Sequence, residues 1–405
     1  MSSQTAFPLQ IVTTGDLKAL CQALWNWELC DSCLDAAPKG LPHCGVASCN
    51  NCPWGLRAER LEPFFDFYRK ATRPYVPDFF GANDQAIRNH QDLRDIISFI
   101  KRHGAEQSRQ WCMHEYFTLR GAEEVSSVPD SDKTRAFELA ARIMTMTSLS
   151  CGNGEKSLPA EASWDVEDQQ GDAPRTWRDV DTLSSTMHDL FVSRIHPNLQ
   201  PSDSQSSLIR QNLTAANLKK MAGLRIESTD SLHNHLDLNP TTGVVMIFHH
   251  TGFLREHLLG TKTDSQRNAS LSRLLALETL CTFQLLFPSE PSSQALLRNL
   301  VSKQGFDPDC LRFGTAPFEL SGEKERAMRF PVWGTRLMHL YDEIENPKPR
   351  GRIEVWLERK SKSRHIMMVT MLGVLAAVLL GLLGLCLSIF QTWIAWQEWK
   401  DGSNR

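Results

Sequence analysis

Residues 366–397 read IMMVTMLGVLAAVLLGLLGLCLSIFQTWIAWQ, and none of these side chains is charged. A helix needs about 20 apolar residues to cross the hydrocarbon core of a bilayer, so this run is long enough to span one. A core helix of a soluble protein would show a polar face, and this run shows none. The sequence therefore predicts a transmembrane helix over 366–397, followed by a short tail at 398–405.

Charges flank this apolar run unequally. The segment 348–365 before it is rich in arginine and lysine, whereas only Lys400 and Arg405 follow it. Because basic residues are retained on the cytoplasmic side, this bias predicts that the N-terminal bulk of the chain is cytosolic. The run is also long and leucine-rich, which suits the endoplasmic reticulum or later secretory membranes. We expect a tail-anchored, single-pass membrane protein.

A second unusual stretch, residues 30–52, reads CDSCLDAAPKGLPHCGVASCNNC. Its spacing is C-x2-C-x15-C-x2-C, which is typical of a zinc site, because two short loops each present two thiolates to one tetrahedral ion. Four protein ligands would leave no open coordination position, so the zinc would be structural. The four predicted ligands are Cys30, Cys33, Cys49 and Cys52.

Alternatives to this zinc site stay open. His43 or Cys44, which lie between the two pairs, could replace one cysteine ligand. The thiols could also be unliganded, or paired as disulfides. A reducing cytosol disfavours disulfides, so the predicted topology disfavours the last of these.

The remaining segments are read from periodicity and composition. In QDLRDIISFIKRHG, residues 91–104, Leu93, Ile96, Ile97 and Ile100 recur at helical spacing, and several other segments show the same pattern. We therefore expect a mainly α-helical fold. The predicted divisions are 1–57 with a helix and the cysteine-rich loop, a helical region 58–150, an acidic Gly/Pro linker 151–180, a second helical region 181–347, and the three C-terminal segments above.

The second helical region contains the one convincing strand pattern, VVMIF at 244–248, preceded by the turn LNPTTG. Upstream, a helix ends near Gly223, and Thr229 or Asp230 could cap a second short helix. This order predicts a helix-turn-helix-strand unit that is winged-helix-like.

Charge disfavours nucleic-acid binding by this unit. Over 405 residues the net charge is -3, so no global basic field exists. The predicted helix-turn-helix offers only Lys219, Lys220 and Arg225. We expect no nucleic-acid partner.

Histidines gather between His233 and His257, in HNH at 233–235 and HHTGFLREH at 249–257. Their spacing matches no hydrolase or metalloenzyme pattern, so buried or surface structural roles are favoured. We assign no catalytic residue. The alternative is a membrane-bound enzyme, or an accessory protein of a biosynthetic pathway, that uses this region.

Seven segments spread over most of the chain carry a resemblance to known proteins: FHHTGFLREHL, LALETL, LVSKQGFDPDCLRF, RLMHLYDEIENPKPRG, WLERKSKSRHIMMVTMLGV, LTAANLKKMAGLRIESTDSLHNHLDLNPTTG and DLRDIISFIK. In these segments the chain resembles a family of uncharacterised filamentous-fungal proteins. The resemblance implies a mostly helical cytosolic region and one C-terminal span, and it supplies no activity.

The leading functional prediction is a non-enzymatic scaffold that presents a helical, zinc-stabilised region to cytosolic protein partners. Within the span, Gly373, Ala377 and Gly381 recur every fourth residue, a pattern that lets a second helix approach closely. We therefore also predict that the span can self-associate.

Overall fold

The structure is a computed structural model of the 405-residue chain. It divides into two units, Met1–Pro347 and Lys348–Arg405. The residues that the structure describes are 7–30, 52–77, 85–120, 128–149, 176–193, 196–199, 204–261, 271–315, 330–348 and 366–402.

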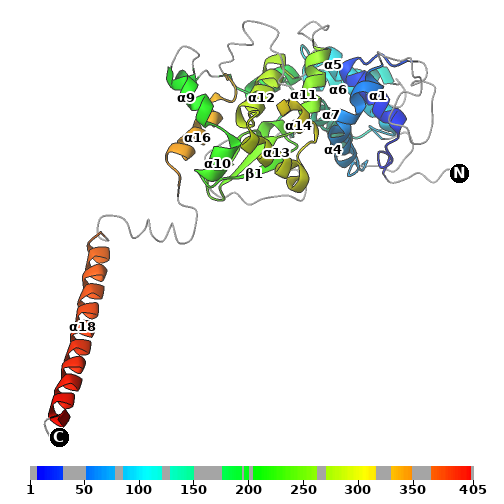
Figure 1. Cartoon of the computed structure of the whole chain (residues 1–405). Helices are drawn as coiled ribbons and strands as arrows, with labels where there is room; N and C mark the ends of the chain where they lie inside the picture. The colour runs from blue at the N-terminus through cyan, green and yellow to red at the C-terminus, as the bar shows by residue number, and fades with distance from the viewer. Residues whose placement is uncertain are drawn as a thin grey trace. The chain divides into compact units, whose positions relative to one another are not determined.

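Helices dominate the described part of the chain, as predicted (Figure 1). The N-terminal set is α1 (Thr14–Trp25), α3 (Pro53–Arg57), α4 (Glu62–Thr72), α5 (His90–His103), α6 (Arg109–Arg120) and α7 (Asp130–Thr145). The later set is α8 (Leu183–Leu190), α9 (Ser204–Asn212), α10 (Ala215–Lys220), α11 (Thr251–Gly260), α12 (Arg273–Leu286), α13 (Pro291–Gln304), α14 (Asp309–Thr315), α16 (Gly334–Glu345) and α18 (Ile366–Gly402).

The helix α5 shows how local sequence and burial agree. The Asn89 side chain accepts a hydrogen bond from the backbone N–H of Asp92 and so caps the first turn. The predicted stripe of Leu93, Ile96, Ile97 and Ile100 is buried, which confirms the periodicity argument.

A three-stranded sheet lies among the later helices, in the order β1-β3-β2. The central strand β3 (Val244–Phe248) pairs in parallel with β1 (Arg225–Thr229) and antiparallel with β2 (Asp237–Asn239). The β2–β3 turn is the predicted LNPTTG. There the Asn239 side chain accepts hydrogen bonds from the Thr241 and Thr242 amides, and Gly243 takes a positive φ.

The strand prediction was incomplete in this region. VVMIF is a strand as predicted, but β1 and β2 were missed. The strand β1 occupies the expected turn after Gly223. Where a second short helix was expected after Thr229 or Asp230, the chain forms a single 3-10 turn, Leu232–Asn234. The winged-helix-like arrangement is therefore not confirmed.

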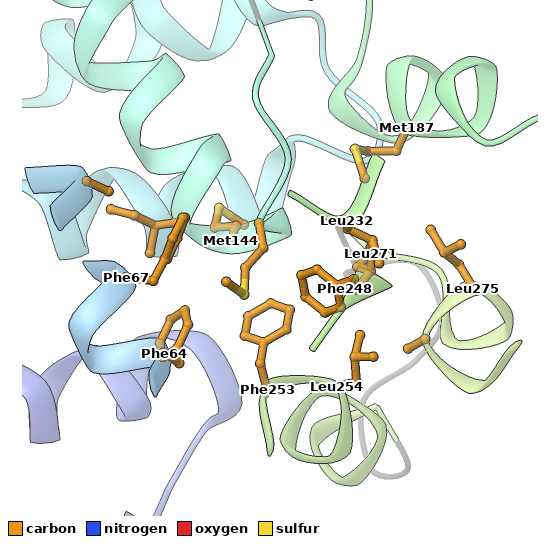
Figure 2. Packing of buried hydrophobic residues seen from close by; sticks show 14 of the residues in the cluster. Phe64, Phe67, Met144, Met187, Leu232, Phe248, Phe253, Leu254, Leu271 and Leu275 are labelled. Atoms are coloured by element: carbon orange, nitrogen blue, oxygen red, sulfur yellow. The ribbon is translucent and has the colours of Figure 1, made fainter. Parts of the chain in front are cut away.

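The apolar core joins the N-terminal helices to the sheet. Figure 2 shows Phe64 and Phe67 of α4 close to Phe253 of α11, with Met144 and Phe248 beside them. The Phe64 and Phe253 ring centroids lie 5.1 Å apart. Residues far apart in the sequence therefore share one hydrophobic cluster.

Close backbone packing at the start of α11 requires a glycine. A Cβ atom built on Gly252 would collide with the backbone carbonyl oxygen of Arg60. A side chain at this position would separate α11 from the segment between α3 and α4.

The C-terminal helix α18 differs from all of these. Its segment Leu372–Gln397 has 26 residues, and no part of it is buried within the structure. The most apolar 18-residue window of the segment has a mean hydropathy of 2.6. At 1.5 Å per residue it is about 39 Å long, enough to cross a membrane. The coarse prediction of one C-terminal helix long and apolar enough to span a bilayer is confirmed.

Candidate functional site

Polar side chains meet where the two parallel strands end. Asp230 follows the last residue of β1, while His249 and His250 follow the last residue of β3. Since parallel neighbours end at the same edge of a sheet, these three residues are brought together. The edge beyond the carboxyl ends of parallel strands is also where α/β proteins place their ligands.

One oxygen of Asp230 is shared by both histidines. Its Oδ1 lies 2.8 Å from the Nε2 atom of His250 and 3.4 Å from that of His249. The two imidazole rings stack with centroids 4.2 Å apart. Both rings are buried, whereas the Asp230 side chain is 44% exposed, so the cluster reaches solvent through the carboxylate.

The proton positions in this cluster follow from its other contacts. The backbone N–H of Asp307 donates to Nδ1 of His249 at 3.0 Å, so that nitrogen carries a lone pair. The tautomer of His249 that fits this hydrogen bond has its proton on Nε2, facing Asp230. Two such donors hold the pKa of the Asp230 carboxyl far below its usual value.

The Asp230, His249 and His250 side chains lie close enough to ligate one metal ion, since their donor atoms are all within 4.8 Å of one another. Their hydrogen-bond pattern fits a metal poorly. A histidine that ligates through Nε2 normally donates its Nδ1 proton to an acceptor, but Nδ1 of His249 already accepts the Asp307 N–H. Ligation through Nε2 of His249 would therefore require this hydrogen bond to be exchanged.

The neighbouring acidic pair, Asp307 and Asp309, forms a tight turn. The Asp307 carboxylate accepts the Asp309 backbone N–H at 2.8 Å, directly before α14. Burial raises the pKa of Asp307 to about 7. Cys310 is fully buried and donates to the backbone oxygen of His249 at 3.1 Å, and burial raises the pKa of its thiol well above the usual value. Such a thiol is not an activated nucleophile.

Two other histidines of the predicted region hold the fold together. His235 is completely buried and hydrogen-bonds Thr282 of α12 at 2.7 Å. His257 bonds the backbone oxygen of Leu271 at 2.8 Å. Desolvation lowers the pKa of His235 to about 3 and that of His257 to about 4, so both rings are neutral at pH 7.

The predicted zinc ligands are only partly within the described residues. Cys52 is buried at the N-terminus of α3, and the half-buried Cys30 packs against the same hydrophobic core. The loop that they delimit is thus anchored at both ends. Cys33, His43, Cys44 and Cys49 lie outside the described residues.

A pocket of about 260 Å³ lies beside this anchor, lined by Trp25, Trp27, Pro53, Arg57 and Glu256 among others. The buried Glu256 carboxylate accepts hydrogen bonds from the Arg57 guanidinium at 2.9 Å and from the Trp27 indole at 3.1 Å. Burial raises the pKa of Glu256, although Arg57 opposes the shift. The ion pair ties α3 to α11.

Sequence reasoning missed Asp230 as a site residue and noted it only as a possible helix cap. The pairing of β1 with β3 is what brings it to His249 and His250. A period-two pattern in RIEST, where Ile226 is buried between exposed neighbours, was the one local signal for β1.

Comparisons with known proteins give no further assignment. No family model, no curated protein and no solved structure matches this chain. The resemblance to a fungal family therefore stays a prediction.

Proposed function

We propose that this chain is a single-pass membrane protein whose Met1–Pro347 unit is a non-enzymatic interaction scaffold on the cytosolic side. The observation that carries the proposal is the exposed apolar segment Leu372–Gln397. In water this helix would leave its whole leucine-rich surface uncovered, whereas in a bilayer that surface meets lipid.

The ends of α18 support this topology. Trp393 and Trp396 lie near one end of the apolar segment, where indole rings favour the headgroup region. The basic residues of 348–365 precede the other end and favour the cytosol. With a length of about 39 Å, the segment exceeds a typical hydrocarbon core of about 30 Å, so it tilts or occupies a thicker secretory membrane.

A scaffold role is favoured by how the described chemical groups are used. The thiols of Cys21 and Cys310 are buried with raised pKa values, and His235 and His257 are held in hydrogen bonds inside the fold. These groups stabilise the unit rather than face a substrate.

The experiment that tests the anchor removes residues 366–397. The full-length protein should pellet with membranes after an alkaline carbonate wash, and the deleted chain should appear in the soluble fraction. A glycosylation acceptor appended after Arg405 should be modified, whereas Asn212 and Asn268, which match the acceptor pattern, should not. Glycans on Asn212 or Asn268 would reverse the proposed orientation.

We also propose a structural zinc ion on Cys30, Cys33, Cys49 and Cys52. The anchoring of Cys30 and Cys52 to the core supports it. The purified chain should contain one zinc per molecule, and serine at Cys33 and Cys49 should remove it. Asparagine at His249 should leave the zinc content unchanged, because the strand-end cluster of Asp230, His249 and His250 is a separate site. Zinc that persists without Cys33 and Cys49 would reject the proposal.

The span is proposed to self-associate through Gly373, Ala377 and Gly381. Gly384 and Ser388 lie on the same side, so the five residues occupy roughly a quarter of the circumference at 3.6 residues per turn. A Cβ atom built on Gly373, Gly381 or Gly384 would meet nothing within 4 Å, so these notches are open. Isoleucine at Gly381 should weaken dimer crosslinking in membranes, while isoleucine at Val378, on another face, should not.

A further inference from the structure

His235 is the centre of a buried hydrogen-bond chain between β3 and α12. Its Nδ1 accepts the backbone N–H of Phe248 at 3.2 Å, and its Nε2 lies 2.7 Å from the Thr282 hydroxyl. That hydroxyl donates to the backbone oxygen of Thr279, whose own hydroxyl accepts the Trp333 indole N–H at 2.9 Å. Every donor in this chain faces an acceptor.

The geometry of these hydrogen bonds keeps His235 in its neutral form. Because Nδ1 accepts an N–H, the proton of the ring is on Nε2 and points to Thr282. A second proton on Nδ1 would face the Phe248 N–H directly, and two donors would then oppose each other in a site with no solvent. The His235–Phe248 bond cannot survive that protonation.

His250 is restricted in a different way. Its Nε2 donates to Asp230, and its Nδ1 is buried without a hydrogen-bond partner. The rings of Phe67 and Phe248 lie beside it, with centroids 6.2 Å and 5.5 Å away. A proton added to Nδ1 would therefore be a buried donor with no acceptor, which is costly.

The charged and titratable neighbours of these rings act in opposite directions. The Arg336 guanidinium, which donates to the backbone oxygen of His235 at 2.6 Å, disfavours a charge on that ring. At His250, Asp230 favours an added proton, while His249 and Lys70 disfavour it.

We propose that His235 and His250 form an acid-sensitive latch, which fastens the carboxyl end of β3 to α12 and to Asp230 at neutral pH and releases it on acidification. Burial supports this reading, since it lowers the pKa of His235 to about 3 and that of His250 to about 4. The inference does not depend on the membrane topology or on the zinc loop.

The direction of the pH effect follows from these lowered values. An unfolded histidine has a pKa of about 6.5, so between about pH 4 and 6.5 the unfolded chain binds more protons than the folded one. Stability is therefore fully present above about pH 6.5 and falls as the pH falls. Each ring alters the unfolding equilibrium by about tenfold per pH unit in this window.

The test uses the full chain in detergent micelles, with urea unfolding followed by circular dichroism between about pH 5 and 6.5. His235→Asn keeps an acceptor for the Phe248 N–H, and His250→Gln keeps a donor for Asp230, but neither new side chain titrates. Relative to the wild type, each variant should take up about one proton fewer on unfolding. His188→Asn, at an exposed position on α8, should take up the wild-type number. Proton uptake is the slope of the unfolding free energy against pH, and this slope can be measured even if a variant is less stable at every pH.

Hydrogen exchange separates a latch from general acid denaturation. At about pH 5, after correction for intrinsic rates, the amides of residues 244–250 should lose protection while those of α5 keep it. Unchanged proton uptake in both variants would overturn the proposal, as would simultaneous loss of protection in α5 and β3.

Discussion

The helices α12 and α18 are both rich in leucine, yet they occupy different surroundings. In α12, most apolar residues are buried, and three of its polar residues, Glu278, Thr279 and Thr282, are buried and hydrogen-bonded. In α18, the apolar residues are exposed all round, and Leu372–Gln397 contains no acidic or basic residue. The difference teaches that an apolar run can pack as a core helix when the fold satisfies the acidic group that it carries. The helix α18 carries no acidic or basic group over Leu372–Gln397 and is long and apolar enough to cross a membrane.

The largest expected effect comes from giving α18 charges that nothing in the fold satisfies. Arginine at both Leu380 and Leu383 should cost about 5–7 kcal/mol of insertion free energy, since each central arginine costs roughly 2.5–3.5 kcal/mol. The carbonate-resistant membrane fraction should fall sharply. Alanine at both positions should retain it, and undiminished membrane binding of the arginine variant would mean that α18 is not the anchor.

The converse change removes a satisfied charge from α12. The Glu278 carboxylate accepts the backbone N–H of Val332 at 2.9 Å and that of Trp333 at 2.6 Å. Leucine at Glu278 would leave the buried N–H of Trp333 and the half-buried N–H of Val332 without this acceptor. The free energy of unfolding should therefore fall by about 2–5 kcal/mol. Urea unfolding measures this loss. Leu274→Ala, at an exposed position of the same helix, should change stability by less than about 0.5 kcal/mol.

The same carboxylate should also make stability depend on pH. Desolvation raises the pKa of Glu278 from 4.5 to about 7. Because the folded value is the higher one, this contribution is fully present below about pH 4.5 and is lost as the pH rises through 7. Relative to Glu278→Gln, the wild type should lose about 3 kcal/mol between about pH 4.5 and 8. Parallel pH profiles for the two proteins would contradict the burial argument.

The smallest expected effect concerns two glycines of α11. Alanine at Gly252 would place its Cβ against the Arg60 carbonyl, and overpacking of this kind costs about 1–3 kcal/mol. At Gly260 the nearest atom to an added Cβ is 3.7 Å away, so Gly260→Ala should be neutral or slightly stabilising. Thermal unfolding of the two variants compares them directly, and equal midpoints would show that the backbone adjusts at Gly252.

Local patterns in the sequence were enough to predict a mainly helical fold, the helix α5 and the long apolar helix at the C-terminus. Leu93, Ile96, Ile97 and Ile100 recur every three or four residues, and this period alone identifies α5 and its buried face. The run 366–397 needed only its length and lack of charge. In both cases the pattern lies within a single helix and does not depend on the rest of the fold.

The strand-end cluster could not be predicted in this way. Asp230 meets His249 and His250 only because β1 pairs with β3 in parallel. Pairing between strands that are separated in the sequence produces no periodic pattern of apolar residues from which it could be predicted. Likewise, Glu278 stands in an apolar run, and its partners are amides more than fifty residues later. Polar groups that satisfy one another across the fold depend on tertiary structure, which propensity does not encode.

The order of the strands has a consequence for synthesis. β3 is the middle strand of the sheet but the last to leave the ribosome, so β1 and β2 have no partner until Phe248 has emerged. A nascent or truncated chain that stops before Val244 therefore holds two short, unpaired strands and lacks Phe253, the core partner of Phe64. Such a chain is the form in which this protein is most exposed to aggregation and to chaperones.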